Sequence, residues 1–345
     1  MNTDHQYFEE YESYEELFNP LRVDRQARRK RRSKPKYKVK QTREEVIAAT
    51  ADPIGLEAGL NITYKPSRHE AGWLFESLRP FYDQELISDI EALVKGGKEA
   101  NVYRCKAHPA TGETWLAAKV YRPRIFRNLR KDHMYRRGRM TLDTNGRPLK
   151  PHDKRLNRAL DKKSNLGQQL SHTSWLMHEY TTLELLFQAG AAVPQPFAVG
   201  ANAILMAYVG DDNGAAPALN EINLERDEVR SLFREALENI TLMLSYGRIH
   251  ADLSAYNILY WQGEITLIDF PQVVNSRVGK DTHIVGSQVN PDAAIILARD
   301  IGRVCDYFTS QGVRCDARAI FDDMWLQYVH EDPQLRLADA SIWEE

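Results

Sequence analysis

One short motif constrains this chain more than any other feature: His250-Ala251-Asp252, followed by Asn257 and, at the end of an apolar run, by Asp269. Asp252 and Asn257 are five positions apart, and Asp269 follows Asp252 by seventeen. Two carboxylates and an amide supply hard oxygen atoms, which are the ligands that Mg²⁺ takes in proteins. The motif therefore has the donor atoms that a divalent metal ion requires. The alternative is that both aspartates cap turns and that Asn257 is an ordinary turn residue.

This spacing is similar to that of the catalytic loop of protein kinases, H-R-D-x-x-x-x-N, and of the metal-binding aspartate that follows it. In such enzymes the loop aspartate orients the acceptor and takes its proton, while the asparagine and the later aspartate hold the metal. The resemblance implies that Asp252 is the catalytic base. It also implies that Asn257 and Asp269 are metal ligands.

A second, independent signal lies in the first half of the chain. Lys119, within Ala117-Ala118-Lys119-Val120-Tyr121, resembles the V-A-I-K lysine that pairs with the α and β phosphates of ATP. Glu179, on a helix predicted downstream, occupies a position suited to the salt bridge that holds this lysine. The alternatives are an exposed strand lysine and a solvated helix glutamate.

The segment Gly96-Gly97-Lys98-Glu99-Ala100-Asn101-Val102-Tyr103 precedes Lys119. Glycines there let backbone N–H groups approach phosphate oxygens without interference from a Cβ atom. The segment does not match G-x-G-x-x-G. It resembles the shortened G-K-E-A-N-V-Y loop of the RIO family of atypical serine/threonine protein kinases, of which the chain looks like a bacterial or archaeal-like member.

Three further features resemble RIO kinases, and the likeness covers about residues 90 to 330. Ser254 stands two positions after Asp252, where an ordinary kinase has lysine. Phe270-Pro271-Gln272 replaces the end of D-F-G, and no A-P-E segment follows. Asn290-Pro291-Asp292-Ala293 leads into a predicted helix that carries Arg299-Asp300. One departure is Gly96, which stands where many RIO sequences have serine or threonine.

The resemblance implies a nucleotide site with ATP and Mg²⁺, or Mn²⁺ in its place, as cofactors. Adenine is expected at a hinge, Met206-Ala207-Tyr208-Val209, with Met206 at the back of the pocket and backbone bonds from Ala207 and Val209. The alternative is an ordinary buried strand end. The remaining expected nucleotide contacts are Gly96, Gly97, Lys98, Glu99, Ala100 and Val102 in the glycine loop, with Lys119 and Glu179 beyond it.

The order of apolar patterns predicts an α+β chain in which a strand-rich part precedes a helix-rich part. The resemblance makes this a two-lobed protein-kinase-like fold, with an antiparallel sheet and one helix in the N-lobe and a mostly helical C-lobe. The expected boundaries are 1–65 for a charged arm, 66–209 for the N-lobe, 210–330 for the C-lobe and 331–345 for a tail.

Within these parts the expected strands are 101–105, 115–121, 193–199, 203–209, 258–260 and 265–268, with a short helix or strand at 86–93. The expected helices are one through Leu176 and Leu186 that ends near Gly190, and others at 229–246, 295–308 and 317–329. Residues 122 to about 165 are rich in arginine and poor in aliphatic residues, which favours a loop.

The charge pattern and the cysteines limit which partners and which cellular compartment are expected. The arm holds an acidic block and then a basic block, 22–40, and such blocks favour disorder or a loose helix. Cys105, Cys305 and Cys315 form no CxxC pair, so neither a zinc site nor a disulfide framework is expected. This cysteine usage fits a reducing cytoplasm, where we expect the protein to lie. No run of 18 apolar residues occurs, so we expect no membrane partner.

Three readings of the function follow. The first is an ATP-dependent protein kinase or ATPase of RIO type, acting in ribosome small-subunit maturation, with Asp269 transiently phosphorylated in the ATPase case. RNA would then contact the basic segments 22–40 and 122–139. The second is a small-molecule kinase of the aminoglycoside or choline type, which shares the H-x-D-x-x-x-x-N loop. The third is a nucleotide-sensing assembly factor. The phosphoacceptor itself is not predicted.

Overall fold

The computed structural model of this chain describes residues 61–97, 99–122, 141–150, 153–162, 164–278 and 288–330. The expected arm therefore lies outside the described residues except for positions 61–65. The tail 331–345, the basic segment 22–40 and all but Arg122 of the basic segment 122–139 also lie outside them. The domain boundaries stay predictions.

A six-stranded sheet forms the first half of the described fold, in the order β1-β2-β3-β4-β6-β5. Neighbouring strands are antiparallel, except that β1 runs parallel to β2. The β3–β4 turn closes at Gly112, whose φ of 76° favours glycine. The strands are β1 (Asn61–Ile62), β2 (Ile87–Gly96), β3 (Ala100–Ala107), β4 (Trp115–Tyr121), β5 (Pro196–Val199) and β6 (Ala203–Ala207).

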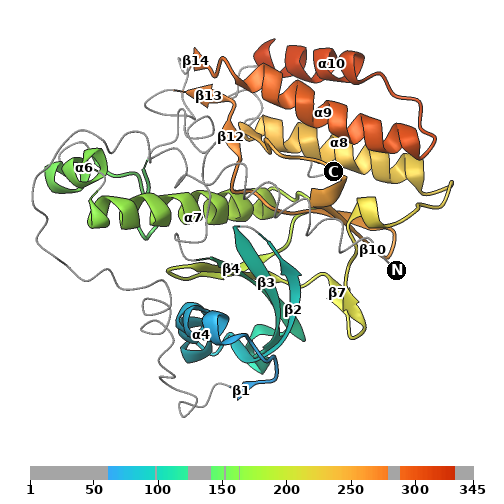
Figure 1. The fold of residues 1–345 in the computed structure, drawn as a ribbon. Coiled ribbons are helices and arrows are strands. Elements are labelled where there is room, and N and C mark those ends of the chain that lie inside the picture. The colour runs from blue at the N-terminus through green and yellow to red at the C-terminus, as the bar shows by residue number, and fades with distance from the viewer. Residues whose placement is uncertain are drawn as a thin grey trace, which may run out of the picture. The chain divides into compact units, whose positions relative to one another are not determined.

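Helix α4 (Arg68–Asp83) covers one face of this sheet. Its Leu74, Leu78 and Phe81 are buried in one cluster with Tyr103 and other residues of the strands. Figure 1 shows α4 on the side of the sheet away from the later helices. This helix corrects the expectation of a single N-lobe helix. The Ser67 N–H donates to Glu70 in the first turn, and the S-x-x-E spacing of these two residues is a helix-start signal in the sequence.

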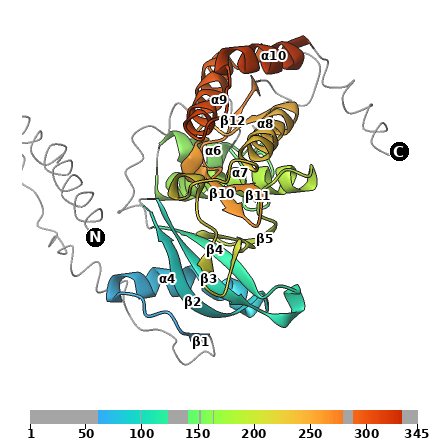
Figure 2. The same ribbon diagram turned by 90° about the vertical axis from the view of Figure 1, so that its right-hand side faces the viewer.

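Helix α7 (Asn165–Gln188) covers the other face of the sheet. Trp175 and Leu176 pack with strand residues, whereas Leu183 and Leu186 near its end belong to the core of the C-terminal helices. In both views α7 lies between the sheet and those helices (Figures 1 and 2). The predicted helix ending near Gly190 is thus confirmed, and it is longer than its apolar pattern suggested.

A short helix, α6 (Lys154–Asp161), packs beside the start of α7 and corrects the expectation of a loop there. The two helices approach so closely that a Cβ atom at Gly167 would lie 1.9 Å from the Ala159 carbonyl oxygen. The sequence offered a signal for α6, because Leu156, Ala159 and Leu160 have the i, i+3, i+4 spacing of a helix, but charged residues outnumber them in this stretch.

The second half is mostly helical, as predicted. Its core joins Leu232 and Ile240 of α8, Ile301 and Phe308 of α9, and Leu267 of the β10–β11 hairpin. The elements are β7 (Gly210–Asp211), β8 (Gly214–Ala215), η4 (Leu219–Glu221), α8 (Val229–Ser245), β9 (Arg248–Ile249), η5 (Ala255–Asn257), β10 (Ile258–Trp261), β11 (Glu264–Leu267), β12 (Val274–Asn275), β13 (Arg277–Val278), β14 (Gln288–Val289), α9 (Ala293–Ser310) and α10 (Ala317–His330).

The α+β prediction, with an antiparallel sheet followed by a mostly helical part, is confirmed. The helical character was expected to begin at Gly210, but the β7–β8 hairpin comes first. Within the described residues, every helix is too short or too polar to cross a membrane.

Candidate active site

Lys119 lies between two carboxylates that come from different parts of the fold. Its Nζ atom is 2.5 Å from Glu179 Oε1 on α7 and 2.5 Å from Asp269 Oδ1, which follows β11. Lys119 is 8% exposed and Glu179 is 3% exposed, so neither is a solvated surface residue. Burial alone would lower the pKa of Lys119, but the two carboxylates outweigh it and raise this pKa. The lysine is therefore charged.

Tyr121 completes the surroundings of Glu179. It lies two residues after Lys119 on β4, so its side chain faces the same way, and its hydroxyl donates to Glu179 Oε2. Tyr121 is fully buried, with its ring 4.6 Å from that of Trp175. Burial raises the pKa of Glu179 despite the nearby lysine, and burial together with Glu179 raises the pKa of Tyr121. The phenol therefore remains a donor.

The β10–β11 hairpin brings Asp269 to the catalytic loop. The Ile268 N–H donates to the Asn257 carbonyl across 3.0 Å, which places the next residue, Asp269, beside Asn257. His250 Nε2 lies 3.0 Å from the Ile268 carbonyl, so this nitrogen carries the proton. Burial lowers the pKa of His250, which favours the neutral ring. The histidine thus links the loop to the strand before Asp269.

Two residues of this region have a backbone that L-amino acids rarely adopt. Ala251 has a φ of 68° and Asp269 a φ of 74°, both in the left-handed region. Such conformations persist only where neighbouring contacts impose them, and they concentrate at functional sites.

Helix α9 provides those contacts for the loop. Asp300 Oδ2 accepts from the Ala251 N–H at 2.6 Å, and Arg299 donates to the Ala251 carbonyl. Arg303, one turn further, lies 2.9 Å from Asp252 Oδ1. Asp300 is 2% exposed, and burial raises its pKa to about 6 although Arg299 and the Ala251 N–H oppose the shift.

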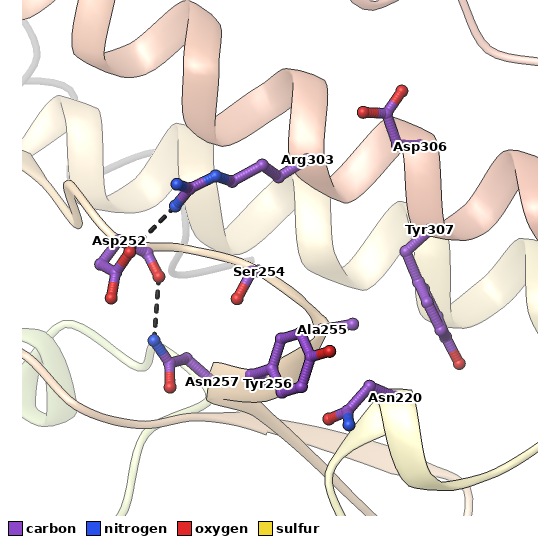
Figure 3. Close-up of a pocket in the computed structure, with 9 residues that line it drawn as sticks. All are labelled: Asn220, Asp252, Ser254, Ala255, Tyr256, Asn257, Arg303, Asp306 and Tyr307. Atoms are coloured by element: carbon purple, nitrogen blue, oxygen red, sulfur yellow. Dashed lines mark hydrogen bonds and ion pairs between the residues drawn. The ribbon is translucent and has the colours of Figure 1, made fainter. Parts of the chain in front are cut away.

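Asp252 opens onto a cavity of about 670 Å³ (Figure 3). The amide nitrogen of Asn257 points at the Asp252 carbonyl oxygen, 2.9 Å away, and its own carbonyl oxygen makes no recorded bond within the described part of the chain. Other lining residues include Asn220, Ser254, Tyr256, Arg303 and Tyr307. The predicted base therefore faces a space that can admit an acceptor.

The glycine loop joins β2 to β3 near Lys119. A Cβ atom at Gly97 would lie 2.6 Å from the Ala100 carbonyl oxygen, so this turn requires glycine. The Gly97 N–H donates to Asn101 Oδ1 at 3.4 Å, and that oxygen also accepts from Arg122. Gly96 ends β2. Glu99 accepts a backbone bond from Arg122, and Lys98 lies outside the described residues.

The strand register puts Met206, which was expected at the back of the adenine pocket, on the same face of the sheet as Lys119. Val102 is directly opposite Lys119, and Met206 is directly opposite Ala117, so all four share a face. At the end of β6, the Ala207 N–H donates to the Gln195 carbonyl, and after it the Val209 carbonyl accepts from the Ala216 N–H. These bonds leave the Val209 N–H without a recorded partner in the described part of the chain.

Comparison with known proteins decides the family. A family model described as the RIO domain matches residues 134–320. The chain belongs to the RIO family. RIO-type serine/threonine-protein kinase Rio1 of Haloferax volcanii is 28% identical over 231 residues, which cover 66% of this chain and 66% of that protein. Serine/threonine-protein kinase RIO1 of Chaetomium thermophilum is 29% identical over 242 residues, covering 67% of this chain and 41% of that protein.

Both matches cover less than two thirds of the relative's own length. A crystal structure of a kinase domain is also similar to this chain, with a TM-score of 0.36 and 12% identity over 64% of this chain and 63% of that one. The expected resemblance to the RIO family is confirmed. The RIO match begins after the glycine loop and Lys119, so their assignment to the site rests on the contacts with Glu179 and Asp269.

The donor atoms of the RIO chain fit a metal that is held mainly by a nucleotide. Asn257 offers an amide oxygen, and Asp269 offers the carboxylate oxygen that does not contact Lys119. Mg²⁺ is commonly bound by one or two carboxylates together with substrate phosphates. Among the described residues, no group of three or more His, Cys, Asp or Glu could hold a metal alone.

Three residues of this RIO site were not predicted from the sequence to be site residues: Tyr121, Asn101 and Arg303. Tyr121 and Asn101 stood inside quoted motifs, and their strand positions were the available signal. Arg303 had no signal, because its partner Asp252 lies 51 positions away.

Proposed function

We propose that this RIO chain transfers the γ-phosphate of ATP to serine or threonine hydroxyls of proteins, itself included. The observation that supports this most is the convergence of Lys119, Glu179 and Asp269 beside a loop whose Asp252 faces a cavity. The relatives named above are serine/threonine kinases, which agrees with the same reaction. Mg²⁺ would be held by Asn257 and Asp269, and it would offset the charge of the phosphates.

Each residue has a separate task in this reaction. Lys119 binds the α and β phosphates while Glu179 holds its ammonium group in place. Asp252 orients the acceptor hydroxyl and takes its proton as the hydroxyl oxygen bonds to the γ-phosphorus. The bond from that phosphorus to the oxygen of ADP breaks in the same step. The cavity beside Asp252 is the route by which the acceptor arrives.

Adenine recognition would use the backbone after β6. The Ala207 N–H and the Val209 carbonyl already have partners, so the Ala207 carbonyl and the Val209 N–H are the groups left for adenine. One accepts and one donates, which complements the amino group and the ring nitrogen of adenine. Val102, Ala117 and Met206 would line the space on the sheet face.

The test uses the full chain with γ-labelled ATP and Mg²⁺, with dephosphorylated casein as acceptor. Asp252→Asn is expected to lower transfer by about 10²–10⁴-fold while leaving the affinity for a fluorescent ATP analogue within about twofold. Lys119→Met is expected to weaken both. Arg318→Met is the control, because Arg318 is exposed on α10 and pairs with Asp322.

Other outcomes separate the rival functions. Faster phosphorylation of choline or kanamycin than of casein or of the chain itself would favour a small-molecule kinase and contradict the proposal. Hydrolysis without transfer, together with a hydroxylamine-sensitive phosphate on Asp269, would favour an ATPase. Action in ribosome maturation, RNA contact through 22–40 and 122–139, and a cytoplasmic location remain predictions.

A further inference from the structure

The catalytic loop lacks a cation that ordinary protein kinases carry. Ser254 occupies the position two residues after Asp252 where those enzymes have lysine. A serine hydroxyl bears no charge, so position 254 cannot provide an ion pair for the carboxylate of Asp252. If Asp252 needs a cationic partner to fix its orientation, another segment has to supply one.

The side chain of Arg303, on α9, lies where such a cation is needed, beside Asp252. Figure 3 shows its side chain reaching from the helix to the Asp252 carboxylate, and its Nη1 atom is 2.9 Å from Oδ1. In the described part of the chain, Arg303 is the one cation recorded in an ion pair with Asp252. The contact engages one carboxylate oxygen, which leaves Oδ2 for the acceptor hydroxyl.

The neighbouring residues of α9 have a different task. Arg299 and Asp300 bind the backbone of Ala251, so they hold the path of the loop. Arg303 contacts the side chain of Asp252 and therefore acts on the direction of the carboxylate. The two tasks are separable by mutation, because they involve different atoms.

The exposure of the pair indicates that it contributes little to folding. The side chains of Arg303 and Asp252 are 42% and 41% exposed, and ion pairs with this degree of exposure add only about 0–1 kcal/mol to stability. Both residues line the cavity by which the acceptor would enter. A loss of the arginine should thus appear in turnover rather than in folding.

We propose that Arg303 is a positioning residue for Asp252, supplying from α9 the positive charge that is absent at Ser254. It holds Oδ1 so that Oδ2 faces the acceptor hydroxyl. This proposal rests on the phosphotransferase function proposed above. Arg303 lies outside the sequence motifs that predicted the site.

The experiment compares wild type with Arg303→Met, which keeps the length of the apolar stem, and with Arg303→Lys, which keeps the charge. Casein phosphorylation and autophosphorylation give kcat and the KM for ATP, and thermal unfolding reports folding. Arg303→Met is expected to lower kcat at least tenfold, with the KM for ATP within about twofold and Tm within about 2 °C. Arg303→Lys is expected to recover part of the lost kcat, and the exposed Arg318→Met to match wild type.

A double variant distinguishes positioning from a general structural effect. In an Asp252→Asn background, Arg303→Met is expected to lower the residual rate by less than about twofold, because its partner charge is already gone. An undiminished effect in that background, or a kcat within twofold of wild type for Arg303→Met alone, overturns the proposal for Arg303 and leaves the proposed function intact. Wild type that neither transfers phosphate nor hydrolyses ATP overturns both.

Discussion

Lys119 is held by charges that only the folded chain brings together, since Glu179 is 60 positions away and Asp269 is 150 positions away. The ammonium group has one partner on α7, Glu179, and a second partner, Asp269, which under the proposed function would also hold the metal. Bound phosphates would therefore share the ammonium group with Asp269 rather than meet an unpaired lysine. The position of the Lys119 ammonium group therefore depends on how firmly Glu179 is held.

Tyr121→Phe tests that point. The change removes the hydroxyl that donates to Glu179 Oε2, and leaving a buried acceptor unsatisfied costs about 1–3 kcal/mol. We expect the free energy of unfolding in urea to fall by that amount and the KM for ATP to rise several-fold. Tyr260→Phe is the matched control, because the Tyr260 hydroxyl also donates to a glutamate, Glu228, at 2.9 Å, but that bond is only partly buried. Equal losses in the two variants would contradict a special role for Tyr121.

Asp300→Asn tests the charge state of the buried anchor of the loop. Burial raises the pKa of Asp300 to about 6, whereas an unfolded aspartate titrates near 4. Between about pH 4 and pH 6 the folded chain therefore binds more protons at this site than the unfolded chain, so its stability contribution falls as pH rises through this window and is constant above it.

Asparagine does not titrate, so the comparison isolates this group. We expect the unfolding free energy of wild type minus that of Asp300→Asn to increase by about 1 kcal/mol when pH is lowered from 7 to 5. Chemical unfolding at several pH values measures it. A difference that stays flat or decreases over this range would show that Asp300 is ionised throughout.

Sequence reasoning could single out only residues that belong to a contiguous motif, such as Asp252, Asn257 and Lys119, and their roles stay predictions. It could not find Arg303, because no periodicity links α9 to the catalytic loop and an arginine on an exposed helix face has no distinguishing pattern. Tyr121 could not be predicted as a site residue for a related reason. A buried tyrosine on a strand is usually a core residue, and only the structure shows that its hydroxyl contacts Glu179.

At the scale of elements, the strands and most helices follow from local patterns, and the exceptions have physical causes. Helix α4 contains Gly72 and Pro80, which read as turn signals. The burial of Leu74 and Leu78 against the sheet overrides those local preferences. Helix α6 is short and carries more charged than apolar residues, which masked its helical spacing in the sequence. Packing between elements, which one sequence does not display, decided both cases.

Gly97→Ala tests whether the turn of the glycine loop contributes to nucleotide binding. The added Cβ would lie 2.6 Å from the Ala100 carbonyl oxygen, a backbone atom that cannot move without changing the turn. We expect nucleotide affinity to fall about tenfold, equivalent to about 1.4 kcal/mol. Titration with a fluorescent ATP analogue measures this.

Gly302→Ala is the matched control for that variant. Nothing lies within 4 Å of a Cβ atom added at Gly302, and alanine is favoured over glycine inside a helix by about 0.5–1 kcal/mol. The control should therefore bind nucleotide as wild type does and unfold at a slightly higher temperature. Unchanged affinity in Gly97→Ala would show that the turn does not contact the nucleotide.

At the scale of the whole described fold, α7 connects two hydrophobic cores. Its Leu176 packs with the sheet, and its Leu186 packs with the C-terminal helices. Glu179 lies between these two positions on the same helix. The residue that holds Lys119 is therefore placed where the two cores meet, and so is the contact from Lys119 to Asp269.

A nucleotide bound by Lys119 on the sheet and by Asn257 and Asp269 on the helical half would link both halves, so it should stabilise the native chain as a whole. A ligand that binds only the folded state adds RT ln(1 + [L]/Kd), about 2.7 kcal/mol at a hundredfold excess over Kd. We expect Mg²⁺ with a non-hydrolysable ATP analogue to raise Tm by several degrees, and excess EDTA to remove most of that shift.

Asp269→Asn is expected to abolish the part of the shift that depends on Mg²⁺, because it removes the charged metal ligand while keeping the size of the side chain. Asp322→Asn is the matched control, since Asp322 pairs with Arg318 on the exposed face of α10, and it should retain the full shift. A shift that is the same with Mg²⁺ and with EDTA would mean that Asn257 and Asp269 hold no metal. A shift retained in Asp269→Asn would place the metal on other ligands, and the pairing of Lys119 with Asp269 would then serve the fold rather than the nucleotide.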